Sequence, residues 1–255
     1  MADTGGVLGP PEGPFSIRSD AVDALPIGDL SRFFNPFLRH FMREALRSGG
    51  EVQVSAPGGT VDGIFLYHPL EREGSIFTRA RRIAESFVRP SAEVAVYWDE
   101  PLAAGAEPFA IYSGQPAESS PPHRFAHPVR VARPEDGPAI LGLMQRVYGR
   151  VDARWIETAR PPEELAFVVE LEGQIVGVGW ANSVGRFGRL HSLTVAPEFR
   201  RIGVGSDLFR ARVEWLRAAG VTQVISEIAE RNVASRRIAD AGGLEPIGRI
   251  FRSPG

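Results

Sequence analysis

The sequence predicts a mixed α/β protein of the α+β class, in two domains joined by a linker. Its 255 residues exceed the usual size of one domain. In the second half, segments of strand and helix periodicity follow in the order strand, helix, antiparallel strands, helix, strand, helix, strand. That order favours an α+β or mixed α/β fold around a central sheet. A third observation, a proline-rich stretch near the middle of the chain, separates the two domains.

This stretch, SGQPAESSPPHRFAHP from Ser113 to Pro128, has no apolar period and is predicted to be a linker. His123 and His127 lie within it and are expected to be solvated rather than to bind a metal. The expected divisions are a flexible tail at 1–15, an N-terminal α/β domain at 16–112, a linker at 113–127 and a C-terminal domain at 128–255.

The N-terminal domain is expected to contain a helix at 30–47, a hairpin at 51–68 that turns at Pro57-Gly58-Gly59, a helix at 80–88 and a strand at 92–98. Its hairpin, helix and strand have the same order as the elements at 166–228, which indicates a degenerate internal repeat. The aromatic run Phe33, Phe34, Phe37 and Phe41 is expected to pack in the core.

The C-terminal domain shows clearer periodicity. Pro134, Glu135 and Asp136 are start signals for a helix, Glu172-Gly173 is typical of a hairpin turn, and Gly220 of a helix end. The expected elements are strands at 129–132, 166–171, 174–181, 188–195, 222–228 and 244–251, and helices through 140–147, from 206 and at 232–241.

Composition excludes several classes of function. A formal net charge of -2 argues against a broad surface for nucleic acid. With no cysteine, disulfides, thiolate metal sites and a cysteine acyl-enzyme are ruled out, and no metal is expected. No apolar run approaches the roughly 20 residues that span a bilayer, and the first residues lack signal-peptide character, so a cytoplasmic protein without membrane contacts is expected.

The chemistry-bearing stretch is LHSLTVAPEFRRIGVGSDLF, where a strand bends into a helix. The first amides of a helix have no partner within it and carry partial positive charge. Gly203 and Gly205 allow close approach of the backbone, and Arg200 and Arg201 add donors, so a diphosphate is the expected ligand. Because every basic residue here is arginine, the position of these arginines matters more than their type.

Other phosphate sites fit less well. A mononucleotide P-loop requires a lysine, and the chain has none. A dinucleotide fingerprint requires a third glycine after the first strand of a βαβ unit, whereas here a hairpin precedes the bend. A nucleotide-binding module nevertheless stays open as an alternative, and it predicts binding of ATP or NAD instead of coenzyme A.

LTVAPEFRRIGVGSDLF resembles the acyl-CoA pyrophosphate motif of the GCN5-related N-acetyltransferase (GNAT) superfamily, a strand with V-x-P and then R/Q-x-x-G-x-G/A at a helix start. NVASRRIADAGGLEPIG is similar to the family segment N-x-x-[AS]-x-x-[LIV]…G-F after the fifth strand. The likeness covers about Pro128 to Arg252. It implies a central, mostly antiparallel and splayed sheet flanked by helices, and an acyl-CoA-dependent N-acyltransferase, most simply of acetyl groups. The N-terminal half faintly resembles a degenerate first copy in tandem members, with no glycine pair in its bend SIFTRARRIAESF.

The resemblance also implies contacts for the acyl-CoA. Main-chain groups of Leu193, Thr194 and Val195 would meet the pantetheine arm, and the Val195 amide would polarise the thioester carbonyl. Asn232 would hold the pantetheine or a water, with Ser235 and Arg236 near the adenosine. The diphosphate would be wrapped by Arg200, Arg201, Ile202, Gly203, Val204, Gly205 and Ser206.

Acyl transfer to an amine requires a base more than an acid. An alkyl ammonium of pKa about 10.4 loses its proton at pH 7 at a cost of about 4–5 kcal/mol, whereas the leaving thiol, of pKa about 8.5, requires only about 2 kcal/mol. His191 is the leading candidate base, since alternation along a strand would place Arg189, His191, Leu193 and Val195 on one face, that of the acyl-CoA. Glu227 on the next strand is the alternative base.

Two departures from the family pattern affect the prediction. The usual thiolate-protonating tyrosine is replaced by Ala239, which leaves the acid unassigned, although Tyr148 could reach in from the first helix of the domain. The chain ends before the family's final strand, so a strand from the N-terminal half or from a second subunit, as in a homodimer, could cover the open sheet edge. The expected acceptor is a small-molecule amine or a peptide N-terminus. The alternative function is a non-catalytic acyl-CoA sensor.

Overall fold

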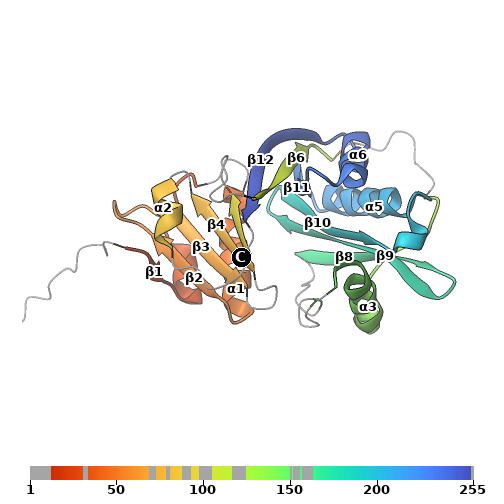
Figure 1. The fold of residues 1–255 in the computed structure, drawn as a ribbon, viewed down its shortest axis with the longest axis horizontal. Coiled ribbons are helices and arrows are strands. Elements are labelled where there is room, and N and C mark those ends of the chain that lie inside the picture. The colour runs from red at the N-terminus through yellow and green to blue at the C-terminus, as the bar shows by residue number, and fades with distance from the viewer. Residues whose placement is uncertain are drawn as a thin grey trace, which may run out of the picture. The chain divides into compact units, whose positions relative to one another are not determined.

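A computed structural model describes residues 13–30, 34–68, 73–78, 81–87, 93–97, 105–116, 125–149, 151, 156 and 163–253. The chain divides into two compact units, residues 1–107 with 250–255 and residues 108–249. Each unit combines a sheet with helices (Figure 1), which confirms the predicted mixed α/β class. Within the described ranges, no helix is long and apolar enough to cross a bilayer.

The first unit has sheet order β1-β2-β3-β4-β5-β12. The β2, β3 and β4 strands pair antiparallel, β4 and β5 pair parallel, and Phe251 to Ser253 of β12 pair antiparallel with β5. Its elements are β1 (Phe15–Ser16), α1 (Leu38–Arg47), β2 (Glu51–Ser55), β3 (Gly63–His68), β4 (Glu73–Thr78), α2 (Arg81–Ser86) and β5 (Glu93–Tyr97), with 3-10 turns at Ser19–Ala24 and Asn35–Phe37.

The helix predicted at 30–47 begins only at Leu38. Pro36 lacks an amide hydrogen and fits only the first turn of a helix, so a 3-10 turn over Asn35–Phe37 precedes α1. The aromatic run packs in the core as expected. The Phe41 ring lies 5.8 Å from that of Phe37 and 6.5 Å from that of Phe34, while Phe33 lies outside the described residues.

The second unit has sheet order β6-β11-β10-β9-β8-β7. The β10 and β11 strands pair parallel, and the other described pairs of this unit are antiparallel. Its elements are β6 (Glu107–Gly114), β7 (Val129–Val131), α3 (Gly137–Tyr148), β8 (Glu164–Leu171), β9 (Gln174–Val184), β10 (Phe187–Val195), α5 (Val204–Ala218), β11 (Gln223–Ala229), α6 (Val233–Ala241) and the start of β12 (Glu245–Ser253), with 3-10 turns at Pro134–Asp136 and Pro197–Phe199.

Two apolar clusters hold α3 and α5 on opposite faces of this sheet (Figure 1). On one face, Leu143 and Met144 of α3 pack against Trp180 of β9. On the other face, Leu208 of α5 packs against Leu190 of β10. These stripes have the 3.6-residue spacing that the sequence shows, and they fix which side chains of β10 face each helix.

Part of each unit has the same strand topology. In β2 to β5 and again in β8 to β11, two antiparallel pairs are followed by a parallel pair whose strands are joined across a helix, α2 or α5. The internal repeat indicated by the sequence is therefore present at the level of strand order and direction.

The sequence did not indicate β6 as part of the second sheet. Its residues pair antiparallel with β11 from Phe109↔Ala229 to Gly114↔Val224, and the compact unit begins at Pro108, before the predicted linker. A strand that precedes the linker thus covers the edge of β11, which is one of the two solutions expected for that edge. The linker residues 117–124, with His123, lie outside the described residues.

Candidate active site

The bend between β10 and α5 is built on left-handed backbone. Gly203, the N-cap of α5, has φ 103°, and Arg201 has φ 65°. A residue with a Cβ is strained at such angles, which explains a glycine at 203. The helix begins directly afterwards, at Val204. The sequence motif thus brings the chain abruptly from the end of a strand into the first turn of a helix.

The amides of this bend lack acceptors. The first amide of α5 that has an acceptor is that of Asp207, which donates to the carbonyl oxygen of the N-cap residue Gly203 at 3.0 Å. From Arg201 to Ser206, no amide has an acceptor among the described residues. Successive free amides at a helix start form a site for an anion.

Gly205 has a different role from the one expected. A Cβ at this position would lie 3.0 Å from Cδ1 of Ile238 and 3.8 Å from Cγ2 of Val195. The glycine therefore allows α6 to pack closely on the start of α5, rather than leaving open space for a ligand. Nearby, Arg200 Nε donates to the Val195 carbonyl oxygen at 3.1 Å, which fastens the bend to the end of β10.

The β10 and β11 strands separate beside this bend. Their described pairing begins at Phe187↔Gln223 and ends at Arg189↔Ile225, although β10 continues to Val195. In the first unit the corresponding strands do not separate, because β4 and β5 pair through all the residues of β5, from Glu93 to Tyr97. Among the described strand pairs, the main chain of β10 beyond Arg189 therefore has no partner strand on the β11 side, whereas β4 of the first unit stays paired with β5.

A β-bulge divides β10 into two parts. His191 pairs with Trp180, but Thr194 already pairs with Val178, so one extra residue lies between them. Ser192 takes it up with φ 53°. Such an insertion reverses which residues face each side of the sheet.

The predicted single face for Arg189, His191, Leu193 and Val195 is therefore wrong. His191 lies opposite Trp180, on the face that carries α3. Leu193 and Val195 pack against the cluster of α5 on the other face. The extra residue at Ser192 is the physical reason, and nothing in the apolar alternation of this segment shows it.

The main chain beyond the bulge also alternates. Ala196 N–H donates to the Val176 carbonyl oxygen on β9 at 2.9 Å. By alternation, the Thr194 amide also points toward β9, and the Val195 amide points to the other side, where β11 separates. The Thr194 amide is thus directed to β9 and not to a ligand, whereas the Val195 amide is free to donate to one.

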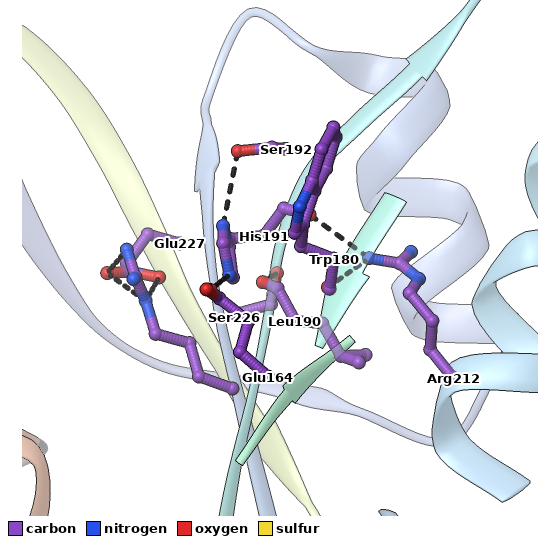
Figure 2. Close-up of polar contacts among 9 residues, drawn as sticks. Glu164, Trp180, Leu190, His191, Ser192, Arg212, Ser226 and Glu227 are labelled. Carbon is purple, nitrogen blue, oxygen red and sulfur yellow. Dashed lines mark hydrogen bonds and ion pairs between the residues drawn. The ribbon is translucent and has the colours of Figure 1, made fainter. Parts of the chain in front are cut away.

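His191 is held in a pair with a carboxylate. Its Nε2 lies 2.9 Å from Glu164 Oε1 on β8, and its Nδ1 lies 3.2 Å from Ser192 Oγ (Figure 2). The side chains of His191 and Glu164 are only 16% and 12% exposed. When Nε2 carries the proton that Glu164 accepts, Nδ1 is left with a lone pair that can accept a proton.

Glu227 is engaged differently. Arg189 donates to it through Nε at 3.0 Å and through Nη2 at 3.0 Å, so both carboxylate oxygens accept from one guanidinium (Figure 2). The Glu227 side chain is 8% exposed. Arg189 thus holds the Glu227 carboxylate in a fixed orientation through two charge-assisted hydrogen bonds.

Tyr148 lies next to this part of β10. Thr194 Oγ1 donates to the Tyr148 hydroxyl oxygen at 3.1 Å, and the Tyr148 side chain is exposed. The structure thus places the C-terminal end of α3 beside the strand that carries the Val195 amide. Ala239, in contrast, is buried in the cluster beneath α5.

Comparisons with known proteins identify the domain. Residues 141–242 match the model of the acetyltransferase (GNAT) family. The second unit contains a GNAT domain. No curated protein matches the sequence.

Solved structures show the same fold around and beyond the GNAT domain. A Drosophila protein is 13% identical, covers 94% of this chain and 98% of its own, and has a TM-score of 0.66. A tandem GNAT protein from the clavulanic acid biosynthesis pathway is 15% identical, with 94% and 97% coverage and a TM-score of 0.63. A GCN5-related N-acetyltransferase from Sphaerobacter thermophilus is 15% identical, with 80% and 79% coverage and a TM-score of 0.54. A GNAT-like origin of the N-terminal half stays a prediction.

The second motif of the GNAT domain serves partly to cap and fasten α6. Asn232 is the N-cap, and its Oδ1 accepts from Ser235 N–H at 3.2 Å. Arg236 donates to the Tyr112 hydroxyl at 3.3 Å and to the Glu230 carbonyl oxygen at 3.1 Å. The contacts of these residues with an acyl-CoA stay predictions.

Sequence reasoning missed the role of His127. Its main-chain N–H and its Nδ1 both contact Asp207 Oδ2, at 3.0 Å and 2.9 Å. Asp207 lies in the first turn of α5 and is 2% exposed. His127 thereby ties the end of the linker to the start of the helix. No local sequence signal links two residues so far apart in the chain.

Proposed function

We propose that the GNAT domain transfers an acetyl group from acetyl-CoA to a primary amine by direct attack in a ternary complex. The row of free amides from Arg201 to Ser206, next to the point where β10 and β11 separate, carries the proposal. The diphosphate would accept from these amides, with Arg200 and Arg201 beside it. The pantetheine arm would lie along the uncovered main chain at Leu193 and Val195.

His191 is the proposed base. Glu164 accepts from Nε2 and orients the ring, so Nδ1, beside Ser192, can take a proton from the acceptor amine. The amine nitrogen then attacks the thioester carbon, and the carbonyl oxygen becomes negative at the Val195 amide. The carbon–sulfur bond breaks and its electron pair goes to sulfur. The nitrogen loses its second proton as the thiolate gains one, and the products are an amide and coenzyme A.

Glu227 is assigned to positioning rather than to proton removal, because Arg189 donates to both of its oxygens. Tyr148 is the proposed donor of a proton to the leaving thiolate. The Tyr148 hydroxyl lies 3.1 Å from Thr194 Oγ1, beside the strand that carries the Val195 amide. Water could replace this donor at modest cost, since a thiol of pKa about 8.5 is a good leaving group at neutral pH.

The absence of a tyrosine at Ala239 favours a second candidate, a non-catalytic domain that senses or stores acyl-CoA. Incubation with acetyl-CoA and a panel of alkylamines, amino acids, aminoglycosides and short peptides separates the two, with release of free thiol as the signal. Turnover of any acceptor supports the transferase. Tight binding of acetyl-CoA without release on any acceptor supports the sensor, and binding of ATP or NAD in place of coenzyme A contradicts both.

A further inference from the structure

An arginine is buried beneath the bulge of β10. Arg212 of α5 is 2% exposed. Its Nε donates to the Leu208 carbonyl oxygen of its own helix at 3.0 Å. Its Nη1 donates to the carbonyl oxygens of Trp180 at 3.0 Å and His191 at 3.3 Å (Figure 2). Among the described residues, no carboxylate pairs with it. Burial lowers the pKa of Arg212 to about 9, which leaves it charged at neutral pH.

The fold makes room for this guanidinium. A Cβ on residue 179 of β9 would lie 3.0 Å from Arg212 Cζ and 3.1 Å from Nε and Nη1, so Gly179 is required for the guanidinium to lie flat against the strand. A buried charge without a counter-charge destabilises a fold, and an apolar side chain would fill the same space more favourably. A purely structural reason for an arginine here is therefore weak.

The acceptors of Arg212 show what it holds. Trp180 and His191 form the last residue pair before the bulge, and Nη1 joins their carbonyl oxygens. Ser192, the next residue, takes the left-handed conformation. Arg212 thus binds the main chain of β10 at His191, one residue before the bulge at Ser192 reverses which side chains face each side of the sheet. The same bulge separates His191 from Leu193 and turns the Val195 amide away from β9.

We propose that Arg212 is a positioning residue for acyl transfer, which holds the bulge through the Trp180 and His191 carbonyls and so sets the distance between the base and the Val195 amide. This inference rests on the proposed function. It assigns Arg212 no contact with either substrate. Loss of the guanidinium should therefore reduce the rate of the chemical step more than the affinity for coenzyme A, because the bend amides lie beyond the bulge.

The test uses the full chain with acetyl-CoA and the acceptor that gives the fastest thiol release in the amine panel. We expect Arg212→Met to lower kcat by about a hundredfold, since small misplacements of reacting groups cost this much, and to change the Kd for coenzyme A less than threefold. Arg212→Lys, whose ammonium can still reach one carbonyl, should recover at least a tenth of kcat. Arg217→Met, on the exposed side of the same helix, is the matched control and should behave as wild type.

A kcat within threefold of wild type in Arg212→Met overturns the inference, as does a parallel loss of kcat and of coenzyme A affinity. If Arg212→Met does not fold, Gly179→Ala tests the same point with the charge retained, because its methyl group presses on the guanidinium. Wild-type kcat in Gly179→Ala then overturns the inference. If wild type itself releases no thiol with any acceptor, the proposed function fails; if wild type is active and the variants are too, only this inference fails.

Discussion

The proposed binding of a diphosphate by the bend amides is best tested at Gly203, by comparing Gly203→Asn with Gly203→Asp. Both residues tolerate left-handed backbone and are good N-caps, and the two differ by one charge. Space is available, because a Cβ here would lie 3.6 Å from His127 Cε1 and 3.9 Å from Asp207 Oδ2. We expect the two variants to unfold within about 1 kcal/mol of one another, with any added repulsion from Asp207 offset by the helix dipole.

Coenzyme A affinity should separate them. A carboxylate at residue 203 would lie about 5 Å from a phosphate bound to the free amides, where two like charges at an effective dielectric constant of about 20 repel by about 3 kcal/mol. Gly203→Asp should therefore bind coenzyme A about a hundredfold more weakly than Gly203→Asn by isothermal titration calorimetry. The difference should shrink as salt is added.

A matched pair at the far end of the same helix controls for general effects of charge. Gly220 also has left-handed backbone, at φ 80°, and its Cβ position is open. Gly220→Asn and Gly220→Asp should bind coenzyme A equally. Equal affinities for the two Gly203 variants would refute the idea that the bend amides hold the diphosphate.

Three further predictions concern the base, the acid and stability. His191→Gln should lower kcat/KM by about 10²–10⁴-fold and remove the fall in rate toward acid pH, while Glu227→Gln keeps that fall; the reverse pattern in pH–rate profiles would make Glu227 the base. Tyr148→Phe should lower kcat by about tenfold, most strongly where release of the thiol from acyl-CoA limits the rate. An unchanged kcat for thiol release in stopped-flow measurements would show that Tyr148 is not the acid. The Arg130 guanidinium donates to Asp136 at 2.6 Å and lowers the pKa of that carboxyl below its usual 3.8. The stability from this pair is therefore present above the usual aspartate pKa and is lost as pH falls through the depressed pKa. Asp136→Asn should cost about 1–2 kcal/mol in urea unfolding at pH 7 and progressively less as the pH is lowered below about 4, and a cost that does not change with pH would contradict this reasoning.

Much of the second unit could be predicted because its signals are local. The apolar stripes of α3 and α5, the Glu172-Gly173 turn and the strand-bend-helix motif each depend on residues close in sequence, and the structure has them where expected. In the first unit, α1 was misplaced at its start because a proline turn interrupts an apolar segment that has helical spacing. Periodicity alone does not distinguish a 3-10 turn from a helix.

The features that the sequence could not predict depend on contacts between residues far apart in the chain. Ser192 is an ordinary strand residue in sequence, and only the pairing of β10 with β9 shows that it bulges. The Glu164 partner of His191 lies on another strand, and Arg212 is one arginine among many until its burial is known. His191 could be named as a candidate base from its residue type, and that role stays a proposal. Its face of the sheet, its contact with Glu164 and the buried Arg212 beneath it could be seen only in the tertiary structure.

The pairing of β6 with β11 has a practical consequence for dissecting the molecule. Because β6 precedes the linker in sequence, a fragment cut at residue 128 would contain every GNAT motif and yet leave the hydrogen-bonding groups along one side of β11 bare. Such a fragment should self-associate or pair with exposed strands of other proteins, whereas a fragment that begins before Glu107 should stay monodisperse. Exchange of the second unit between proteins would have to include the residues of β6 as well.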